Sequence, residues 1–430
     1  MRAIWILLLI GCSGNDNSGT TLPDGSPDAT PDAAADATRD AAPDAAVDPC
    51  TLADWDEGIP FSSGLSASEE TACALRGLDS AFEGQRIVCS GEDSHGVGEA
   101  NLLHVSIARH LILERGFRTV SMEFDRASAA SWNQFIQTGD EAFLERGFID
   151  AAGLSNSRSS EAFVRDLRSI ALELPLGETL LLTGYDVAVG ASSTRSALVS
   201  FLRITEPATA NDWRLRLSDD ADALNAVIEL RELLTARRDE HIALAGLEAT
   251  EDAETDAANL YDGLQFIAYF RAGDFNTGNA THREPGMTRN VMATLARRPG
   301  GLLLTSHNQH CGRDIDIGQA ADGTMTPSLG RSIALSEYGT EFLVLHQLYA
   351  SGAEVLPSAG FPTRAFQAPP TSLEATLGQT LEGEIWLLSN AHTVIEDRTW
   401  TSRYGIPFSP KTRADGYVWL RVTTPILLRE

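Results

Sequence analysis

Histidine and glutamate side chains that could activate water stand in three short segments of the chain. Glu92 and His95 lie in Gly-Glu-Asp-Ser-His-Gly, and Glu123 lies in Met-Glu-Phe-Asp. His307 and His310 lie in His-Asn-Gln-His. A neutral imidazole, with an ordinary pKa of about 6.5, can accept a proton from water at neutral pH, and a nearby carboxylate can orient the ring and stabilise its charged form. These residue types suit hydrolysis by an activated water molecule, if the fold brings the segments together.

Apolar runs ahead of these segments predict the elements that would position them. We expect strands at 85–90, 118–124, 179–183, 301–306 and 341–346, with later strands at 383–388 and 416–422. Helical spacing of apolar residues predicts helices over 99–114, 161–174, 213–246, 255–271 and 289–298. This alternation is typical of an α/β fold whose mostly parallel sheet is covered by helices on both faces. We expect one such domain over residues 50–430, with a helical insertion at about 205–280 and no second core.

The predicted strands bring the polar segments to one edge of the sheet. In open α/β sheets, ligands bind at the carboxyl ends of the strands. The loops near His95 and His307 follow the first and fourth strands, while Glu123 and Asp186 come at the ends of the second and third. We therefore expect the loops near positions 95 and 307 to face each other across one crevice.

These segments, in this order and spacing, resemble the erythromycin esterase family over roughly residues 75–430. The family pattern is GE-x-[ST]-HG, then a helix and Gly-Phe before a strand that ends in Glu, and later HN-x-H. Here the pattern corresponds to 91–96, to Gly116-Phe117 ahead of Glu123, and to 307–310. The segments 281–290 and 415–425 resemble the family's entry into a late helix and its closing strand.

The resemblance implies hydrolysis of an ester, typified by a macrolide lactone, without a cofactor or a covalent intermediate. On that basis His95 takes the proton of water, while Glu92 and Glu123 orient His95 and stabilise its charged form. His307 or His310 hydrogen-bonds the carbonyl oxygen as it becomes anionic. The implied partner is a small-molecule ester or lactone.

Three further residues are expected to contact substrate. Where the family often places an arginine in its first helix, this chain has His104, nine residues after His95. That departure concerns both oxyanion stabilisation and substrate choice. Asp186 and Arg283 are expected to line the same site, with surface or helix-capping roles as the alternative.

Other chemistries use the same residues. The five Glu and His side chains named first are competent ligands for a metal such as zinc, although no HExxH spacing is present. Ser94 lacks the glycine two residues earlier that a nucleophile elbow needs, because Glu92 stands there. The remaining alternatives are a non-catalytic envelope protein that keeps the pocket, and deacylation of an envelope polysaccharide.

The first 49 residues predict export and a membrane anchor. Residues 1–12 have one positive charge, a short apolar run and Leu-Ile-Gly-Cys, which is typical of a bacterial lipoprotein signal with lipidation at Cys12. Residues 13–49 repeat Pro-Asp-Ala and lack apolar periodicity, so we expect a disordered tether. Ser13, which is not aspartate, favours the outer membrane. The net charge of −27 argues against a nucleic-acid partner.

The other four cysteines form an even set, which permits two disulfides in an exported protein. Cys50 and Cys73 flank the start of the globular part and are expected to clip it. Cys89 precedes one motif and Cys311 follows another, so they can pair if the motifs meet. Two unpaired buried thiols are the alternative.

Overall fold

The computed structural model describes residues 58–61, 69–150, 153–187, 192–219, 221–320, 322–356, 360–396, 398–404 and 407–429. The predicted signal, the tether, Cys12 and Cys50 lie outside the described residues. Among the helices of the described part, none combines the length and the apolar character needed to cross a membrane.

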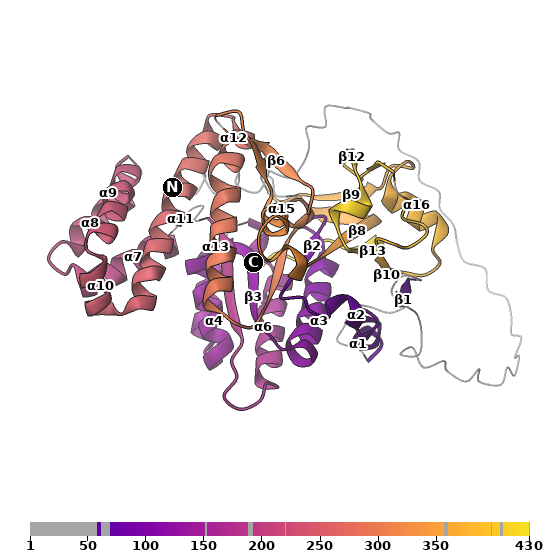
Figure 1. Ribbon diagram of the computed structural model, residues 1–430, viewed down its shortest axis with the longest axis horizontal. Helices are drawn as coiled ribbons and strands as arrows, with labels where there is room; N and C mark the ends of the chain where they lie inside the picture. The colour runs from indigo at the N-terminus through magenta and orange to yellow at the C-terminus, as the bar shows by residue number, and fades with distance from the viewer. Residues whose placement is uncertain are drawn as a thin grey trace, which may run out of the picture.

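A nine-stranded, mostly parallel sheet forms the centre of the molecule (Figure 1). Its order is β1-β10-β13-β8-β2-β5-β3-β4, with β9 paired to β8. The six neighbours from β13 to β4 are parallel, whereas β1, β10 and β9 pair antiparallel. The strands are β1 (Ile59–Phe61), β2 (Ile87–Glu92), β3 (Phe117–Asp125), β4 (Leu181–Asp186), β5 (Gly301–His307), β8 (Phe342–Val355), β9 (Thr363–Gln367), β10 (Ile385–Ser389) and β13 (Gly416–Thr423). The predicted α/β class is therefore confirmed.

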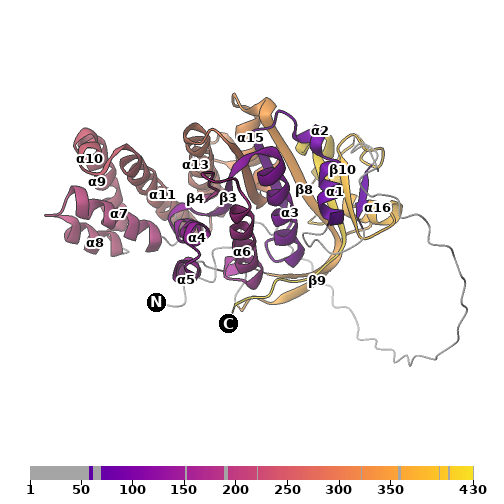
Figure 2. The same cartoon turned by 90° about the horizontal axis from the view of Figure 1, so that it is seen from below.

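Helices cover both faces of this sheet, which explains why its strands are apolar on both sides. On one face, α3 (Gly98–Arg115), α4 (Arg126–Thr138) and α6 (Arg158–Leu172) enclose a core with Val88, Val120 and Leu303. On the other, α13 (Glu284–Arg297), α15 (Leu329–Ala334) and α16 (Leu373–Thr380) pack over Ile87, Leu302 and Leu304. Figure 2 shows α3, α4 and α6 on the opposite side of the sheet from α13 and α15.

The smaller elements complete the chain. They are α1 (Glu69–Arg76), α2 (Asp79–Phe82), α5 (Glu141–Asp150), the short 3-10 helices η5 (Gly153–Ser155) and η7 (Gly339–Glu341), α12 (Phe275–Gly278), the π-helical turn η6 (Asn279–Arg283), α14 (Asn308–Cys311), α17 (Pro410–Arg413), and the paired short strands β6 (Asp316–Gln319) with β7 (Met325–Pro327) and β11 (Trp400–Thr401) with β12 (Pro407–Phe408).

The helical insertion has a hydrophobic core of its own, and the expectation of no second core was wrong. It comprises α7 (Ser192–Thr205), α8 (Ala210–Ser218), α9 (Ala223–Ala236), α10 (Arg238–Ala245) and α11 (Leu247–Arg271), at the left end of Figure 1. Leu202, Leu230 and Leu260 belong to a cluster within these helices, separate from the clusters on the sheet. Helical periodicity shows that a helix has an apolar face, but not whether that face packs on a sheet or on another helix.

Candidate active site

The predicted Glu and His residues meet at the carboxyl ends of β2, β3 and β5. Strands β2 and β5 are parallel neighbours, and their register pairs Glu92 with His307 at the ends of both strands. The imidazole of His95, three residues beyond Glu92, lies with its centroid 5.4 Å from that of His307. The two loops therefore face each other, because adjacent parallel strands end at the same edge.

Both glycines of the Gly-Glu-Asp-Ser-His-Gly segment are explained by close packing at this edge. A Cβ on Gly91 would lie 2.4 Å from Asn308 Oδ1, and a Cβ on Gly96 would lie 2.0 Å from the carbonyl oxygen of Val355. Within the same turn, Ser94 Oγ accepts a hydrogen bond from the N–H of Gly96. The segment is thus a tight turn that Ser94 helps to hold, and it places His95 over the ends of the strands.

His95 lies between two carboxylates. Its Nδ1 is 2.5 Å from Glu92 Oε1, and its Nε2 is 3.8 Å from Glu123 Oε1. The short contact places the ring proton on Nδ1, which makes Nε2 the basic nitrogen of the neutral ring. With 22% of its side chain exposed, His95 is more accessible than either glutamate.

Glu123 is the hub of the site and is ionised. Its Oε1 accepts a hydrogen bond from Arg283 Nη2 at 2.7 Å and lies 3.3 Å from His310 Nε2. Its Oε2 accepts from the Ser306 hydroxyl and from the backbone N–H of His307. Burial acts to raise the pKa of Glu123, but His310, His95 and Arg283 together hold it well below its usual range. We call Glu92, His95, Glu123, Arg283 and His310 the Glu123 centre.

Arg283 and Asp186 belong inside this network and not at the surface. Arg283 is delivered by η6 and also donates to Asp186, with Nη2 at 2.7 Å from Oδ2. The side chains of Arg283 and Asp186 are only 11% and 14% exposed. A guanidinium can serve two carboxylates at once because its donors form a planar fork. Arg283 therefore ties the end of β4 to the end of β3.

His310 is fixed by a residue that sequence reasoning missed. Its Nδ1 is hydrogen-bonded to Glu284 Oε1, while Glu284 Oε2 accepts from the N–H of Leu329 at 2.8 Å. Glu284 is fully buried. Glu284 directly follows the predicted site residue Arg283, and this was the one sequence feature that could have indicated it. However, acidic residues at the start of a helix are also common on protein surfaces.

The two ring nitrogens of His307 are both used by the protein. Nε2 lies 3.1 Å from the backbone oxygen of Asp93, and Nδ1 accepts the N–H of Gln309. Since a neutral imidazole has one donor and one acceptor, His307 in this state joins the two loops and has no further proton to offer. Of the two histidines expected at the carbonyl oxygen, His310 is the one in contact with Glu123.

His104 lies inside the protein and not on the wall of the crevice. Its side chain is buried, and its Nε2 is 3.0 Å from the amide nitrogen of Gln347. Burial lowers its pKa, although the nearby Glu92 acts to raise it. The ring is therefore neutral in the folded protein, and substrate could reach it only after a change of conformation. His104, which was expected to contact substrate, is thus a buried neighbour of Glu92 and His95.

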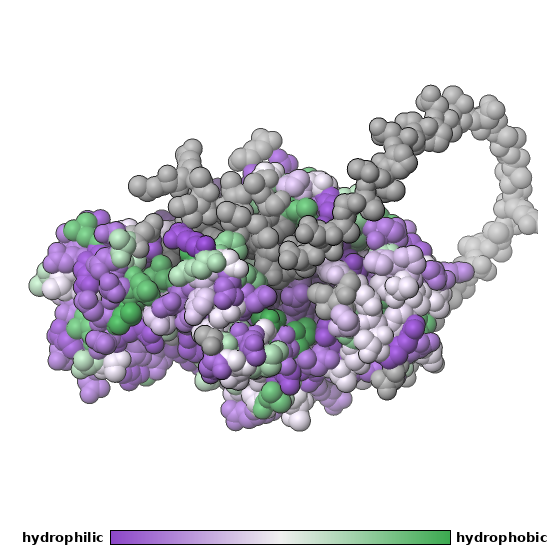
Figure 3. Space-filling view, turned by 90° about the horizontal axis from the view of Figure 1, so that it is seen from above, coloured by the Kyte–Doolittle hydropathy of each residue, from purple (hydrophilic) through white to green (hydrophobic). Residues whose placement is uncertain are grey.

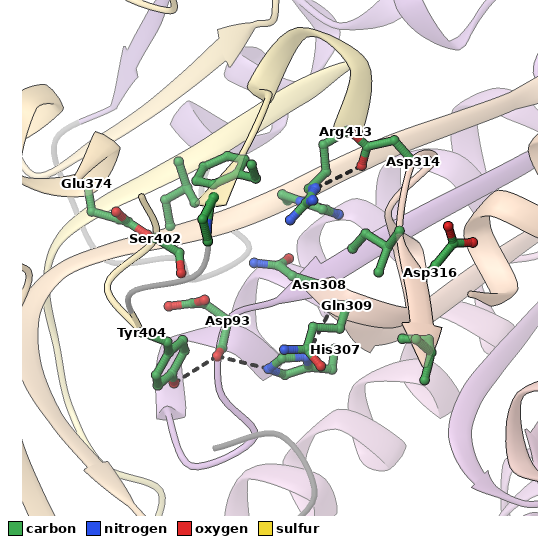
Figure 4. Close-up of a pocket in the computed structure, with 16 residues that line it drawn as sticks. Asp93, His307, Asn308, Gln309, Asp314, Asp316, Glu374, Ser402, Tyr404 and Arg413 are labelled. Atoms are coloured by element: carbon green, nitrogen blue, oxygen red, sulfur yellow. Dashed lines mark hydrogen bonds and ion pairs between the residues drawn. The ribbon is translucent and has the colours of Figure 1, made fainter. Parts of the chain in front are cut away.

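A cavity of about 370 Å³ lies beside His307, on the side away from the Glu123 centre (Figure 4). It lies between the loop carrying Asp93, the α14 region and the segments around Ser402 and Arg413. We call it the His307 cavity. Sequence reasoning missed its lining residues His346 and Glu374, because neither stands in a recognisable motif.

The described residues offer no metal site: no group of three or more His, Cys, Asp and Glu side chains among them has the arrangement to hold an ion. Four of the five predicted donors contact one another, Arg283 or Glu284, and the fifth, His307, is hydrogen-bonded to the backbone of Asp93 and Gln309. The metal-dependent alternative therefore has no ligand set in the described part of the chain.

A disulfide ties the site to the sheet. Cys89 in β2 and Cys311 in α14 are bonded, with their Cα atoms 5.8 Å apart, and both are fully buried. This is the paired alternative for these cysteines, and it fastens the helix that carries His310 to the strand that carries Glu92. Cys73 is disulfide-bonded as well, and its partner lies outside the described residues.

The sequence profile of the family described as Erythromycin esterase matches residues 112–423. No curated protein sequence matches the chain.

Three solved structures have the same fold. A Bacillus cereus protein has a TM-score of 0.70 at 13% identity, over 87% of this chain and 97% of its own. A succinoglycan biosynthesis protein has a TM-score of 0.68 at 14% identity, over 87% and 97%. A mutant of the erythromycin esterase EreC, in its open conformation, has a TM-score of 0.69 at 17% identity, over 85% and 97%.

Proposed function

Because the chain belongs to the erythromycin esterase family, we propose that it hydrolyses a carboxylic ester or lactone with water activated by His95. The observation that carries this proposal is the alignment of Glu92, His95 and Glu123, with one carboxylate at each ring nitrogen. Glu92 keeps the ring proton of His95 on Nδ1. His95 Nε2 then takes a proton from the water molecule as the water oxygen attacks the carbonyl carbon of the ester. The two carboxylates stabilise the imidazolium that results.

The remaining members of the Glu123 centre supply hydrogen-bond donors for the oxyanion. Arg283 and His310 both border Glu123, and Arg283 Nη1 lies 3.4 Å from His310 Nε2. Donors that are already in place where negative charge develops need no reorganisation during the reaction. When the tetrahedral intermediate collapses, the C–O bond to the alcohol breaks and His95 returns its proton to the leaving oxygen. No covalent intermediate with the protein is required.

The test is to replace His95 by asparagine and to measure kcat/KM on p-nitrophenyl acetate and on a macrolide. We expect a loss of about 10²–10⁴-fold, which is the usual contribution of a general base. His241→Asn is the matched control, because His241 is a buried histidine in the helical insertion, away from the sheet edge. Unchanged activity in His95→Asn would contradict the proposal. We also expect EDTA to leave the wild-type rate unchanged, whereas a loss that zinc restores would favour the metal-dependent alternative.

We also propose that the enzyme is exported and held at the cell envelope by a lipid on Cys12. The buried Cys89–Cys311 disulfide supports an oxidising compartment, since such bonds are rare in the cytosol. Cys12→Ser should move the protein from the membrane fraction to the soluble one. Retention of this variant in the membrane would contradict the proposed anchor.

A further inference from the structure

Three buried polar atoms, in side chains that line the His307 cavity, have no hydrogen-bond partner within the described part of the chain. They are Glu374 Oε2, His346 Nε2 and Asn308 Oδ1. The other oxygen of Glu374 accepts the N–H of Arg403, so the side chain is held in place. A buried polar atom without a partner is costly, and such atoms in a native protein commonly mark a place where a ligand or water completes the bonding.

The charged groups around the same cavity are already neutralised within the protein. Asp314 is 2.9 Å from Arg413, and Asp316 is 2.5 Å from Arg331. Asp93 is bonded to Arg403, a side chain that is itself only 3% exposed. Burial lowers the pKa of His346 well below its usual range and raises the pKa of Glu374 to about 7. A ligand in the cavity therefore meets no unpaired formal charge near pH 6, which favours a neutral ligand over an ion.

The remaining walls suit the carbon face of a ring. Ile315, Leu348 and Phe408 supply apolar surface, and the Tyr404 ring lies beside Asp93 (Figure 4). A volume of about 370 Å³ is near the lower end for small-molecule sites. It fits one ring-sized group better than a large macrocycle.

We propose that the His307 cavity is a substrate subsite that binds a neutral, hydroxylated group of the ester, such as a sugar ring or another polyol, with Glu374 and His346 as its hydrogen-bonding residues. A hydroxyl both donates and accepts, so it can complete the bonding of a carboxyl oxygen and of an imidazole nitrogen. The inference rests on the proposed esterase function, because His307 separates this cavity from the Glu123 centre by the width of one side chain.

The kinetic test compares matched esters on the full-length protein. 6-O-acetyl-glucose against hexyl acetate tests a hydroxylated alcohol, and ethyl gluconate against ethyl hexanoate tests a hydroxylated acyl group. We expect at least a tenfold higher kcat/KM for the hydroxylated member of one pair. Glu374→Gln should reduce that preference about tenfold, and His346→Gln should act in the same direction. His241→Gln, which replaces a buried histidine whose Nδ1 also lacks a partner, should leave the preference unchanged. Equal rates within both pairs, or equal losses on all esters, would overturn the proposal.

Direct binding separates this inference from the proposed reaction. Titration of 6-O-acetyl-glucose and ethyl gluconate into His95→Asn reports binding without turnover, even if the wild type hydrolyses neither ester. Adding Glu374→Gln, which keeps the acceptor for Arg403 and the shape of the side chain, should weaken binding of the preferred ester about tenfold. Thermal melts confirm that each variant is folded. Failure of both esters to bind would overturn the subsite while leaving the test of His95 unaffected.

Discussion

The Glu123 centre and the helical insertion are held together in opposite ways. The centre consists of buried polar groups, and its Arg283 spans 160 residues of sequence to reach Glu123. The insertion packs around apolar side chains of neighbouring helices. Its surface keeps exposed apolar residues, including Leu215 and Leu244. Hydrophobic and hydrophilic patches lie side by side at the left end of Figure 3. The proposed reaction therefore depends on the polar groups of the Glu123 centre. The stability of the insertion depends on an apolar core that shares no residue with that centre.

Ion pairs join the insertion to two of the helices that cover the sheet. Arg126, which begins α4, is 2.9 Å from Asp252 and 2.6 Å from Asp256 of α11. Arg289 of α13 is 2.8 Å from Asp262, in the second half of α11. The chain then passes through α12 and η6 to Arg283. The chain therefore connects the insertion directly to Arg283 of the Glu123 centre.

The largest expected effect tests whether the two regions are energetically separate. Leu230→Ala in the insertion and Leu304→Ala in β5 each empty a fully buried position and should each cost about 2–5 kcal/mol of unfolding free energy. Activity should fall less than tenfold in Leu230→Ala and more in Leu304→Ala, because β5 carries His307. Denaturant titration and ester hydrolysis check both. Equal losses of activity would contradict the separation.

A smaller effect is expected from removing the disulfide. Replacing Cys89 and Cys311 together by alanine should cost about 2–4 kcal/mol of stability. Because α14 then loses its covalent link to β2, kcat should fall together with stability. Leu230→Ala, in contrast, should lower stability with little loss of activity. Melting curves and kcat of the double variant provide the measurement. A destabilised variant with wild-type kcat would show that packing alone positions His310.

The smallest effect is a pH dependence that differs between the regions. Burial raises the pKa of Asp256 to about 6, although Arg126 opposes it. The folded state therefore binds this proton more tightly, so its contribution is complete below about pH 4 and is lost as pH rises through 6. His104 and His346 have lowered pKa values, so their contribution is present above about pH 6.5 and is lost as pH falls.

Asp256→Asn should therefore remove about 2 kcal/mol of pH dependence between pH 4 and 7. His346→Gln should instead reduce the loss of stability below pH 6.5. Urea titrations at several pH values measure both slopes. If Asp256→Asn left the dependence of unfolding free energy on pH unchanged, the Arg126–Asp256 contact between α4 and α11 would not be the source of that dependence.

Much of the site could be predicted because it stands at strand ends. Glu92, Glu123 and His307 each lie at or near the last residue of an apolar strand, and parallel neighbours end at one edge. Glu284 and Glu374 lie in helices whose contacts come from distant segments, at His310 and Arg403. Their spacing resembles that of ordinary helical acids, so their burial could not be read from the chain.

The amino-acid sequence by itself determined the α/β class, the shared edge of β2 and β5 and the pair of loops that carry His95 and His307. Local periodicity and strand direction are enough for those features. Only the tertiary structure decided that His307 joins the loops, that Arg283 bridges Glu123 and Asp186, and that the insertion has its own core. These outcomes depend on which side chains pack together across long stretches of chain, and a local pattern does not contain that information.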